Sequence, residues 1–194
     1  MSIAAETTKA TAPAEHRLYT YDELVAAFPE SNQPCELWEG EIIMSPTPSF
    51  FHQEIAFRLQ RALHEWVVKR ALGKVVGAPL DMVLSPHNVT QPDVIYIARE
   101  RLHIIKRVIM GPADLVAEII SLGGRTRDRI EKRDLYEQYG IKEYWIVDPE
   151  AETVDVLSLV DGRYELAMRC DRDGTAASRV GKTPGSLSAA QSDG

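Results

Sequence analysis

The sequence predicts an α/β fold, a mixed sheet flanked by helices, in one domain. Three observations support this prediction. Apolar residues recur at helical spacing between Pro48 and Gly73, and apolar segments of strand length occur at 91–98, 114–121 and 143–149. Two further apolar segments flank Asp161-Gly162, which is a strong hairpin signal. Helices that alternate with strands along the chain are typical of an α/β domain.

The first half of the chain contains two helices and a hairpin. Thr20 and Glu23 form a capping box, which predicts a short helix through about Phe28. CELWEGEIIMSP at 35–46 alternates apolar and polar residues around Glu39-Gly40 and predicts a hairpin. The longest helix follows and ends at Gly73, and KVVGAPLDMVL at 74–84 predicts a strand that is bent or interrupted near Pro79. The apolar positions that define the long helix, Trp66 included, are expected in the core: Ile55, Leu59, Ala62, Leu63, Trp66 and Val67.

The second half is predicted to supply most of the sheet. QPDVIYIA at 91–98 and DLVAEIIS at 114–121 are strands, joined by an irregular or helical link at 100–111. A charged amphipathic helix is predicted from Thr126 to Tyr139, with Ile130 near its apolar face and Gly140 at its end. EYWIVDP at 143–149 is a strand, and 153–160 with 163–170 form the closing hairpin. We expect a disordered leader at 1–16, one domain at 17–174 and a flexible tail at 175–194.

Composition limits the classes of function. The chain has 194 residues, 44% hydrophobic and 26% charged, which is ordinary for a globular protein. Its net charge of −7 argues against nonspecific coating of nucleic acid, which needs many Lys and Arg contacts to phosphates. No apolar segment reaches the roughly 18 residues of a membrane span, and no signal peptide is evident. Cys35 and Cys170 match no metal or redox spacing, so we expect a cytoplasmic protein.

Two carboxylates stand in strands that should be buried. Glu118 interrupts DLVAEIIS, and Asp93 begins the strand after Pro92. If the two strands are neighbours, both carboxylates converge at one edge of the sheet, where they repel each other unless a cation lies between them. Mg²⁺ binds through one or two carboxylates plus waters and phosphate oxygens. We therefore expect a divalent ion at Asp93 and Glu118, with the carbonyl of Ile119 as a further ligand and the ammonium of Lys132 nearby to orient a water or stabilise phosphate charge.

The same residues have simpler interpretations. An aspartate after proline at the start of a strand is commonly a turn or cap residue. Glu118 also fits a structural ion pair with Lys132 or an arginine, which perturbs a carboxylate equally well. A lysine on a helix is most often solvated. From residue chemistry alone, these alternatives stay open beside the metal site.

The motifs together resemble the Uma-two restriction-endonuclease family, a branch of the PD-(D/E)XK nuclease superfamily. The resemblance runs from about Tyr19 to Tyr164. It depends on ELWEGEIIMSP at 36–46, on His52 at the start of the long helix, and on QPDV at 91–94. It continues through DLVAEIIS, the KRDLYEQYGIKEYWIVDP segment at 132–149 and the closing hairpin.

The resemblance implies a restriction-endonuclease-like fold and a Mg²⁺-dependent (or Mn²⁺-dependent) site that cleaves phosphodiester bonds. By motif position, Asp93 is the aspartate of the PD element and Glu118 is the acidic residue of the (D/E)XK element. Ile120 stands where that element has its lysine, and Lys132 is the lysine that would replace it. His52 is implied as a further catalytic residue, and Glu41 as a supporting acid. The implied partner is nucleic acid, in particular DNA, and a homodimer is expected by analogy with nucleases that cut two strands.

Basic residues flank the implied site, where a phosphate backbone needs cationic contacts. One group follows the Glu118 strand and a second lies in the link at 99–107: Arg125, Arg127, Arg129 and Arg133, and Arg99, Arg101, Lys106 and Arg107. Neither a recognition helix nor an aromatic stacking stripe is evident in the sequence. The alternative function is a catalytically inactive nuclease-fold module that binds nucleic acid or a protein partner, which the Ile120 replacement and the net charge favour.

Overall fold

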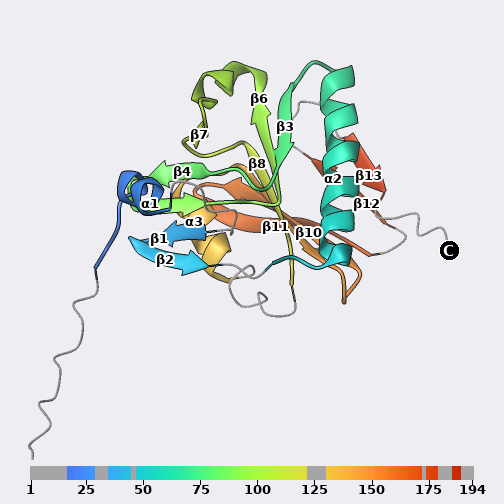
Figure 1. Ribbon diagram of the computed structural model, residues 1–194. Helices are drawn as coiled ribbons and strands as arrows, with labels where there is room; N and C mark the ends of the chain where they lie inside the picture. The colour runs from blue at the N-terminus through green and yellow to red at the C-terminus, as the bar shows by residue number, and fades with distance from the viewer. Residues whose placement is uncertain are drawn as a thin grey trace, which may run out of the picture.

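The computed structural model describes residues 17–28, 35–44, 47–121, 130–171 and 174–178, and the backbone of 185–188. Two principal sheets lie side by side, with the longest helix at one side of the molecule and the first helix at the other (Figure 1). The predicted leader at 1–16 lies outside the described residues. None of the helices in the described ranges is long and apolar enough to cross a membrane.

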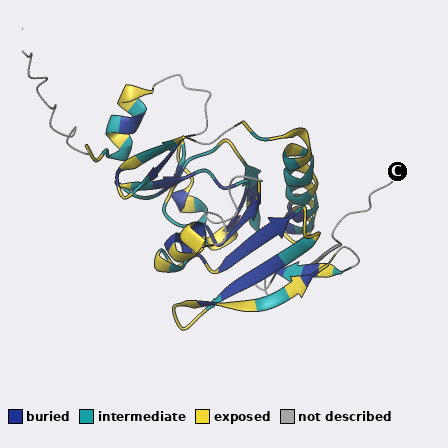
Figure 2. Ribbon diagram, turned by 90° about the horizontal axis from the view of Figure 1, so that it is seen from below, coloured by how far each residue is buried: buried dark blue, intermediate teal, exposed yellow. Residues whose placement is uncertain are grey.

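A six-stranded sheet forms the centre of the fold, in the order β11-β10-β9-β8-β6-β3. Only β8 and β9 run parallel; the other neighbours are antiparallel. Every residue of β8 and β9 is buried, because the sheet is covered on both faces there, and Figure 2 shows the buried residues gathered in these central strands. The strands are β3 (Gly73–Gly77), β6 (Val94–Ala98), β8 (Leu115–Ile119), β9 (Glu143–Asp148), β10 (Thr153–Val160) and β11 (Arg163–Cys170).

A second sheet has five strands in the order β2-β1-β5-β4-β7. It contains the predicted hairpin, whose turn residues Glu39 and Gly40 have φ of 48° and 86°, as a tight hairpin turn requires. The segment predicted as a strand bent or interrupted near Pro79 is interrupted there, and its two parts belong to different sheets: β3 joins the first and β4 the second. The strands are β1 (Cys35–Trp38), β2 (Glu41–Met44), β4 (Met82–Ser85), β5 (Asn88–Thr90) and β7 (Ile109–Met110).

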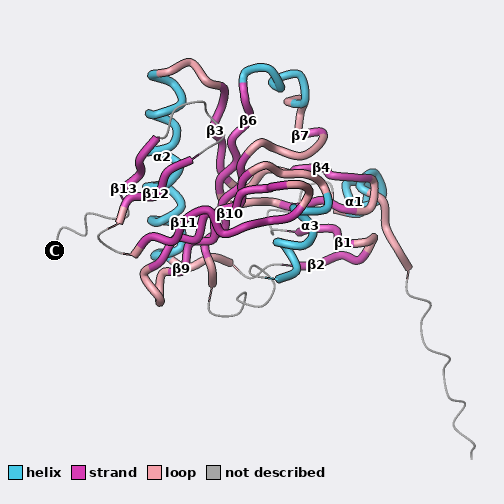
Figure 3. Tube along the Cα trace, turned by 180° about the vertical axis from the view of Figure 1, so that it is seen from behind, coloured by secondary structure: helices cyan, strands magenta, loops and turns pink. Residues whose placement is uncertain are grey.

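Helices α2 and α3 cover opposite faces of the six-stranded sheet (Figure 3), and Leu24 of α1 packs against the five-stranded sheet. On one face, Leu63 and Val67 of α2 pack against Val94 and Leu115. On the other, Tyr136 of α3 is fully buried in the cluster that contains Val116 and Ile95. The helices are α1 (Tyr21–Ala27), α2 (Phe50–Lys69) and α3 (Lys132–Gln138), with a 3₁₀ helix at Arg99–Ile104.

One expectation differs from the structure. Ile130 is 57% exposed and does not belong to the apolar face of α3 (Lys132–Gln138); it lies in a π-helical turn at 130–131 just before that helix, and positions 126–129 lie outside the described residues. The tail predicted to be flexible contains β12 (Thr175–Ser178) and β13 (Gly185–Ser188), which pair antiparallel. Small residues gave no apolar signal for these strands, which is why the sequence did not reveal them.

Candidate functional site

Asp93 and Glu118 stand near each other at the ends of two neighbouring strands. Strands β6 and β8 pair antiparallel with Val94 opposite Ala117, and Asp93 and Glu118 are the next residues along these two strands. Glu118 alternates with Val116 and therefore points to the side of the sheet on which α3 packs, where Val116 and Tyr136 belong to one cluster. The carboxylate of Asp93 instead contacts His52 at the start of α2.

Glu118 is buried, with 3% of its surface exposed, and its carboxylate accepts two hydrogen bonds at one oxygen. Lys132 Nζ donates to Glu118 Oε1 at 2.8 Å, and the Tyr136 hydroxyl donates to the same atom at 2.7 Å. Burial, and then the nearby Glu118 carboxylate, raise the pKa of Tyr136 well above its ordinary value, so this hydroxyl stays a donor. The first turn of α3 therefore supplies an ammonium to the buried glutamate, in the geometry of the ion-pair interpretation.

Asp93 is held by the next strand and by the start of α2. The backbone N–H of Ile119 donates to Asp93 Oδ2 at 2.8 Å, and His52 Nε2 lies 3.2 Å from the same oxygen. Ser49 caps α2 by accepting from the His52 N–H, which fixes the first turn of the helix beside β6. The structure thus brings together Asp93, His52 and Ile119, although Ile119 meets Asp93 through its N–H rather than its carbonyl.

Glu36 joins Asp93, Glu118 and Lys132 in one cluster of charged residues, although it was not predicted as a site residue from the sequence. It lies in β1 with 3% of its surface exposed, and its Oε1 is 3.3 Å from Lys132 Nζ and accepts from the Gln91 N–H at 3.0 Å. Its second oxygen, Oε2, is buried and has no hydrogen-bond partner within the described part of the chain. The alternation in CELW made Glu36 resemble a solvent-facing residue. The signal that was available is the same one that marked Glu118, a glutamate inside a short apolar strand.

The ammonium beside Glu118 comes from Lys132 and not from position 120, where the PD-(D/E)XK pattern has its lysine. Ile120 is buried in the apolar cluster with Tyr136. The ammonium beside Glu118 comes from α3 instead. Lys132 is itself 6% exposed and lies between two carboxylates, Glu118 and Glu36. It is therefore not the solvated helix lysine of the simplest interpretation.

The predicted basic residues contribute little to this cluster where the structure describes them. Arg101 donates to the Pro112 carbonyl and pairs with the fully buried Asp114. Arg133 donates to the Tyr164 carbonyl. Arg125, Arg127 and Arg129 lie outside the described residues. Arg99, Lys106 and Arg107 are exposed in the segment after β6.

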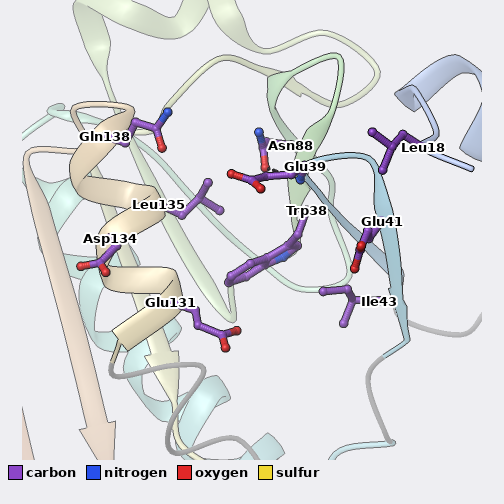
Figure 4. A pocket seen from close by; sticks show the side chains of 10 residues that line it. All are labelled: Leu18, Trp38, Glu39, Glu41, Ile43, Asn88, Glu131, Asp134, Leu135 and Gln138. Atoms are coloured by element: carbon purple, nitrogen blue, oxygen red, sulfur yellow. Dashed lines mark hydrogen bonds between the residues drawn. The ribbon is translucent and has the colours of Figure 1, made fainter. Parts of the chain in front are cut away.

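Two openings lie near the cluster, and they differ in charge. The larger, about 500 Å³, lies between α3 and the β1–β2 hairpin (Figure 4). Its described lining includes four acids and neither lysine nor arginine: Glu39, Glu41, Glu131 and Asp134. The smaller, about 140 Å³, is lined by Asp93 and by one side of α2. A phosphate backbone is repelled by the first opening, and the second leads to a candidate catalytic carboxylate. Glu41, implied as a supporting acid, lies in the first opening and is exposed.

The cluster has donors that suit a hard divalent cation. Among the described residues, no group of three His, Cys, Asp or Glu side chains is arranged to hold a metal ion. Mg²⁺ does not require such a group, because it keeps several waters and uses one or two carboxylates. Asp93 and Glu118 provide two carboxylates at the ends of neighbouring strands, and Glu36 Oε2 is a buried oxygen without a partner in the described residues. The donor set therefore fits Mg²⁺ or Mn²⁺.

Comparison with known proteins identifies the family of this chain. Residues 20–179 match the model of the Uma2 (Uma-two) family, described as "Putative restriction endonuclease". The fold is similar to the crystal structure of a protein from Anabaena variabilis ATCC 29413, described as a putative nuclease belonging to DUF820. The TM-score is 0.71 at 21% identity, covering 86% of this chain and 94% of that one. No curated protein matches the sequence. The restriction-endonuclease-like α/β fold expected from the sequence is confirmed, and the chain belongs to the Uma2 family.

Proposed function

We propose that this chain is a Mg²⁺- or Mn²⁺-dependent endonuclease that hydrolyses phosphodiester bonds in DNA. The observation that carries the proposal is that Asp93 and Glu118 stand at the ends of two paired strands, where the Ile119 N–H donates to Asp93 and the buried ammonium of Lys132 donates to Glu118. Membership of the Uma2 family supports it. A purely structural ion pair accounts for Lys132 and Glu118, but it gives no reason for a second carboxylate, Asp93, beside them.

Asp93 and Glu118 would hold the cation, with the Ile119 carbonyl as a further ligand. Bound there, it would supply Lewis-acid polarisation of the phosphate and a lower pKa for a bound water. The donor set agrees with this role because all the ligands are oxygens.

The remaining groups have separate tasks. Lys132 is held by Glu118 and Glu36, so its ammonium is fixed before substrate arrives and can stabilise charge on the attacked phosphate. His52 lies against Asp93 at the rim of the site, with 13% of its side chain exposed, and can accept the proton of the attacking water. If the chemistry is that of the superfamily, the products are a 3′-hydroxyl and a 5′-phosphate.

An inactive nucleic-acid-binding relative is the second candidate. One contact favours it: Lys132 already neutralises Glu118, which leaves Glu118 with a partner in the absence of metal. This candidate predicts a folded protein without affinity for Mg²⁺ or Mn²⁺ in a calorimetric titration. The endonuclease proposal predicts binding of at least one ion, which Asp93→Asn and Glu118→Gln each weaken.

Plasmid nicking tests the activity directly. Supercoiled DNA is incubated with Mg²⁺ and wild type, Asp93→Asn, Glu118→Gln or the matched control Glu165→Gln, which changes an exposed glutamate on β11. We expect nicking by the wild type and the control, its loss in both site variants, and no nicking in EDTA. Equal activity in all four proteins would contradict the proposal, because the activity would then come from another site or a contaminant.

A further inference from the structure

The phenylalanine side chains of this protein lie on its surface and not in its core. The chain has four phenylalanines, and all four are substantially exposed, at 43% for Phe28, 75% for Phe50 and Phe51, and 63% for Phe57. Three of them lie within eight residues at the start of α2. Exposed apolar groups concentrated at one place mark a binding surface. No stacking stripe was predicted from the sequence, because the helical periodicity that identified the core residues of this helix does not include these phenylalanines.

Four residues form what we call the α2 stripe: Phe50, Gln53, Phe57 and Gln60. Their spacing of three, four and three residues places them along one side of the helix. Three of them, Gln53, Phe57 and Gln60, line the 140 Å³ opening, and Asp93 lines it with them. The stripe therefore runs along α2 to the carboxylate that, by the proposed function, holds the catalytic cation.

We propose that the α2 stripe binds unpaired nucleotides of the substrate strand next to the scissile phosphate. This inference rests on the proposed function for the choice of ligand. Exposed phenylalanine rings stack on bases without regard to sequence, but only on bases that are not already stacked in a duplex. The amide of Gln53, between the rings, and that of Gln60, beyond Phe57, can hydrogen-bond base edges. Seven residues of helix separate the two rings by about 10 Å, the length of about three nucleotides at 3.4 Å each.

Charge favours this side of the molecule for a nucleic-acid strand. Arg61 is exposed and lies one helical turn beyond Phe57, where it can contact a phosphate. The larger opening on the other side of the site has four carboxylates in its described lining and repels phosphates. A second copy of the chain would also cover the two rings, but it would bury Arg61 and the amides, which need polar partners.

Anisotropy of labelled oligonucleotides tests the proposal in EDTA, where binding is measured without cleavage. A 20-nucleotide oligothymidylate is compared with a 20-base-pair duplex, for wild type and for the double variant Phe50→Ala with Phe57→Ala. Phe28→Ala is the matched control, because Phe28 caps α1 at the opposite side of the molecule from α2 (Figures 1 and 3). We expect tighter binding of the single strand by wild type, a loss of at least about tenfold in the double variant, and no loss in the control.

The outcomes separate this inference from the proposed function. A double variant that binds oligothymidylate as well as wild type overturns the inference, even if the wild type nicks plasmid. So does a wild-type dimer that the double variant converts to monomer in sedimentation, because the rings then belong to a protein interface. Phenylalanine-dependent binding without metal-dependent nicking supports the stripe as a binding surface and overturns the endonuclease proposal instead.

Discussion

Lys132 and Glu118 form a buried ion pair, with Nζ 2.8 Å from Oε1, and Lys132 also lies 3.3 Å from a carboxylate oxygen of Glu36. One ammonium thus serves two buried carboxylates from two different sheets. A buried carboxylate without a partner costs several kcal/mol. The first turn of α3 is therefore tied to both sheets by charge, and the candidate site depends on that connection.

Replacing Lys132 by methionine should strongly destabilise the fold. The change keeps the aliphatic stem but leaves Glu118 and Glu36 without their shared cation, at a cost of about 3–5 kcal/mol. Urea unfolding measures the difference, with Lys69→Met, an exposed lysine in the last turn of α2, as the control. A Lys132→Met protein as stable as this control would show that the ion pair contributes nothing.

Glu36→Gln should have the opposite effect on the protein without metal. The cluster of Glu36, Glu118 and Lys132 has one negative charge in excess, and one buried oxygen of Glu36 lacks a partner among the described residues. Removing that charge should leave the melting temperature in EDTA unchanged or higher. The rise in melting temperature on adding Mg²⁺ should shrink, because the ion loses nearby negative charge. A decrease of more than about 2 kcal/mol in the free energy of unfolding in EDTA would contradict this account of the cluster.

Asp114 should make stability sensitive to acid. Burial raises its pKa, but the hydrogen bonds from Lys142 and the Ala98 N–H, with Arg101 nearby, outweigh burial and lower the pKa below the ordinary 3.8. A carboxyl with a lowered folded pKa contributes its full stabilisation above 3.8 and loses it as the pH falls through the folded value.

The Asp114→Asn variant provides the comparison. It should cost about 3–5 kcal/mol at neutral pH, because two cations lose a fully buried partner. Urea unfolding between neutral pH and strong acid should show this difference shrinking below the ordinary pKa of the carboxyl. A difference that stays constant into strong acid would mean that Asp114 titrates alike in the folded and unfolded chain.

Tyr136→Phe should change how stability depends on pH in the alkaline range. The pKa of Tyr136 is raised, so the folded protein holds its proton while the unfolded chain releases it above pH 10. Stability from this hydroxyl is complete below pH 10 and declines above it. The variant should lose about 1–3 kcal/mol at neutral pH through the missing bond to Glu118. Its deficit relative to wild type should decrease as the pH rises past 10, and a deficit that grows there would contradict the assignment.

Local signals predicted most of the fold. The capping box at Thr20 and Glu23 is present, and the turns at Glu39-Gly40 and Asp161-Gly162 both adopt positive φ. Each of these features is decided by residues a few positions apart. The division of the segment around Pro79 between two sheets was not predictable in the same way, because it depends on pairing with β5 and β6, which lie farther along the chain.

The candidate site shows the same division between local and distant information. A carboxylate in an apolar strand marked Glu118, for which the sequence predicted a metal ion with Lys132 nearby or, as the alternative, an ion pair with Lys132 or an arginine. The structure places Lys132 beside it. Glu36 was missed because its environment is created by α3, about one hundred residues away. The α2 stripe was missed for a related reason. Helical periodicity identifies the buried face but does not say how much of the opposite face remains uncovered.

The central claim is that Asp93 and Glu118 share one divalent cation. A crystal soaked in Mn²⁺ tests it most directly, because the anomalous signal locates the ion without assumptions about activity. The account predicts one strong peak within ligand distance of an oxygen from each of these two carboxylates, and its loss in Asp93→Asn. Carboxylates that remain on Lys132 and His52 at saturating Mn²⁺, with no peak between them, would contradict the account.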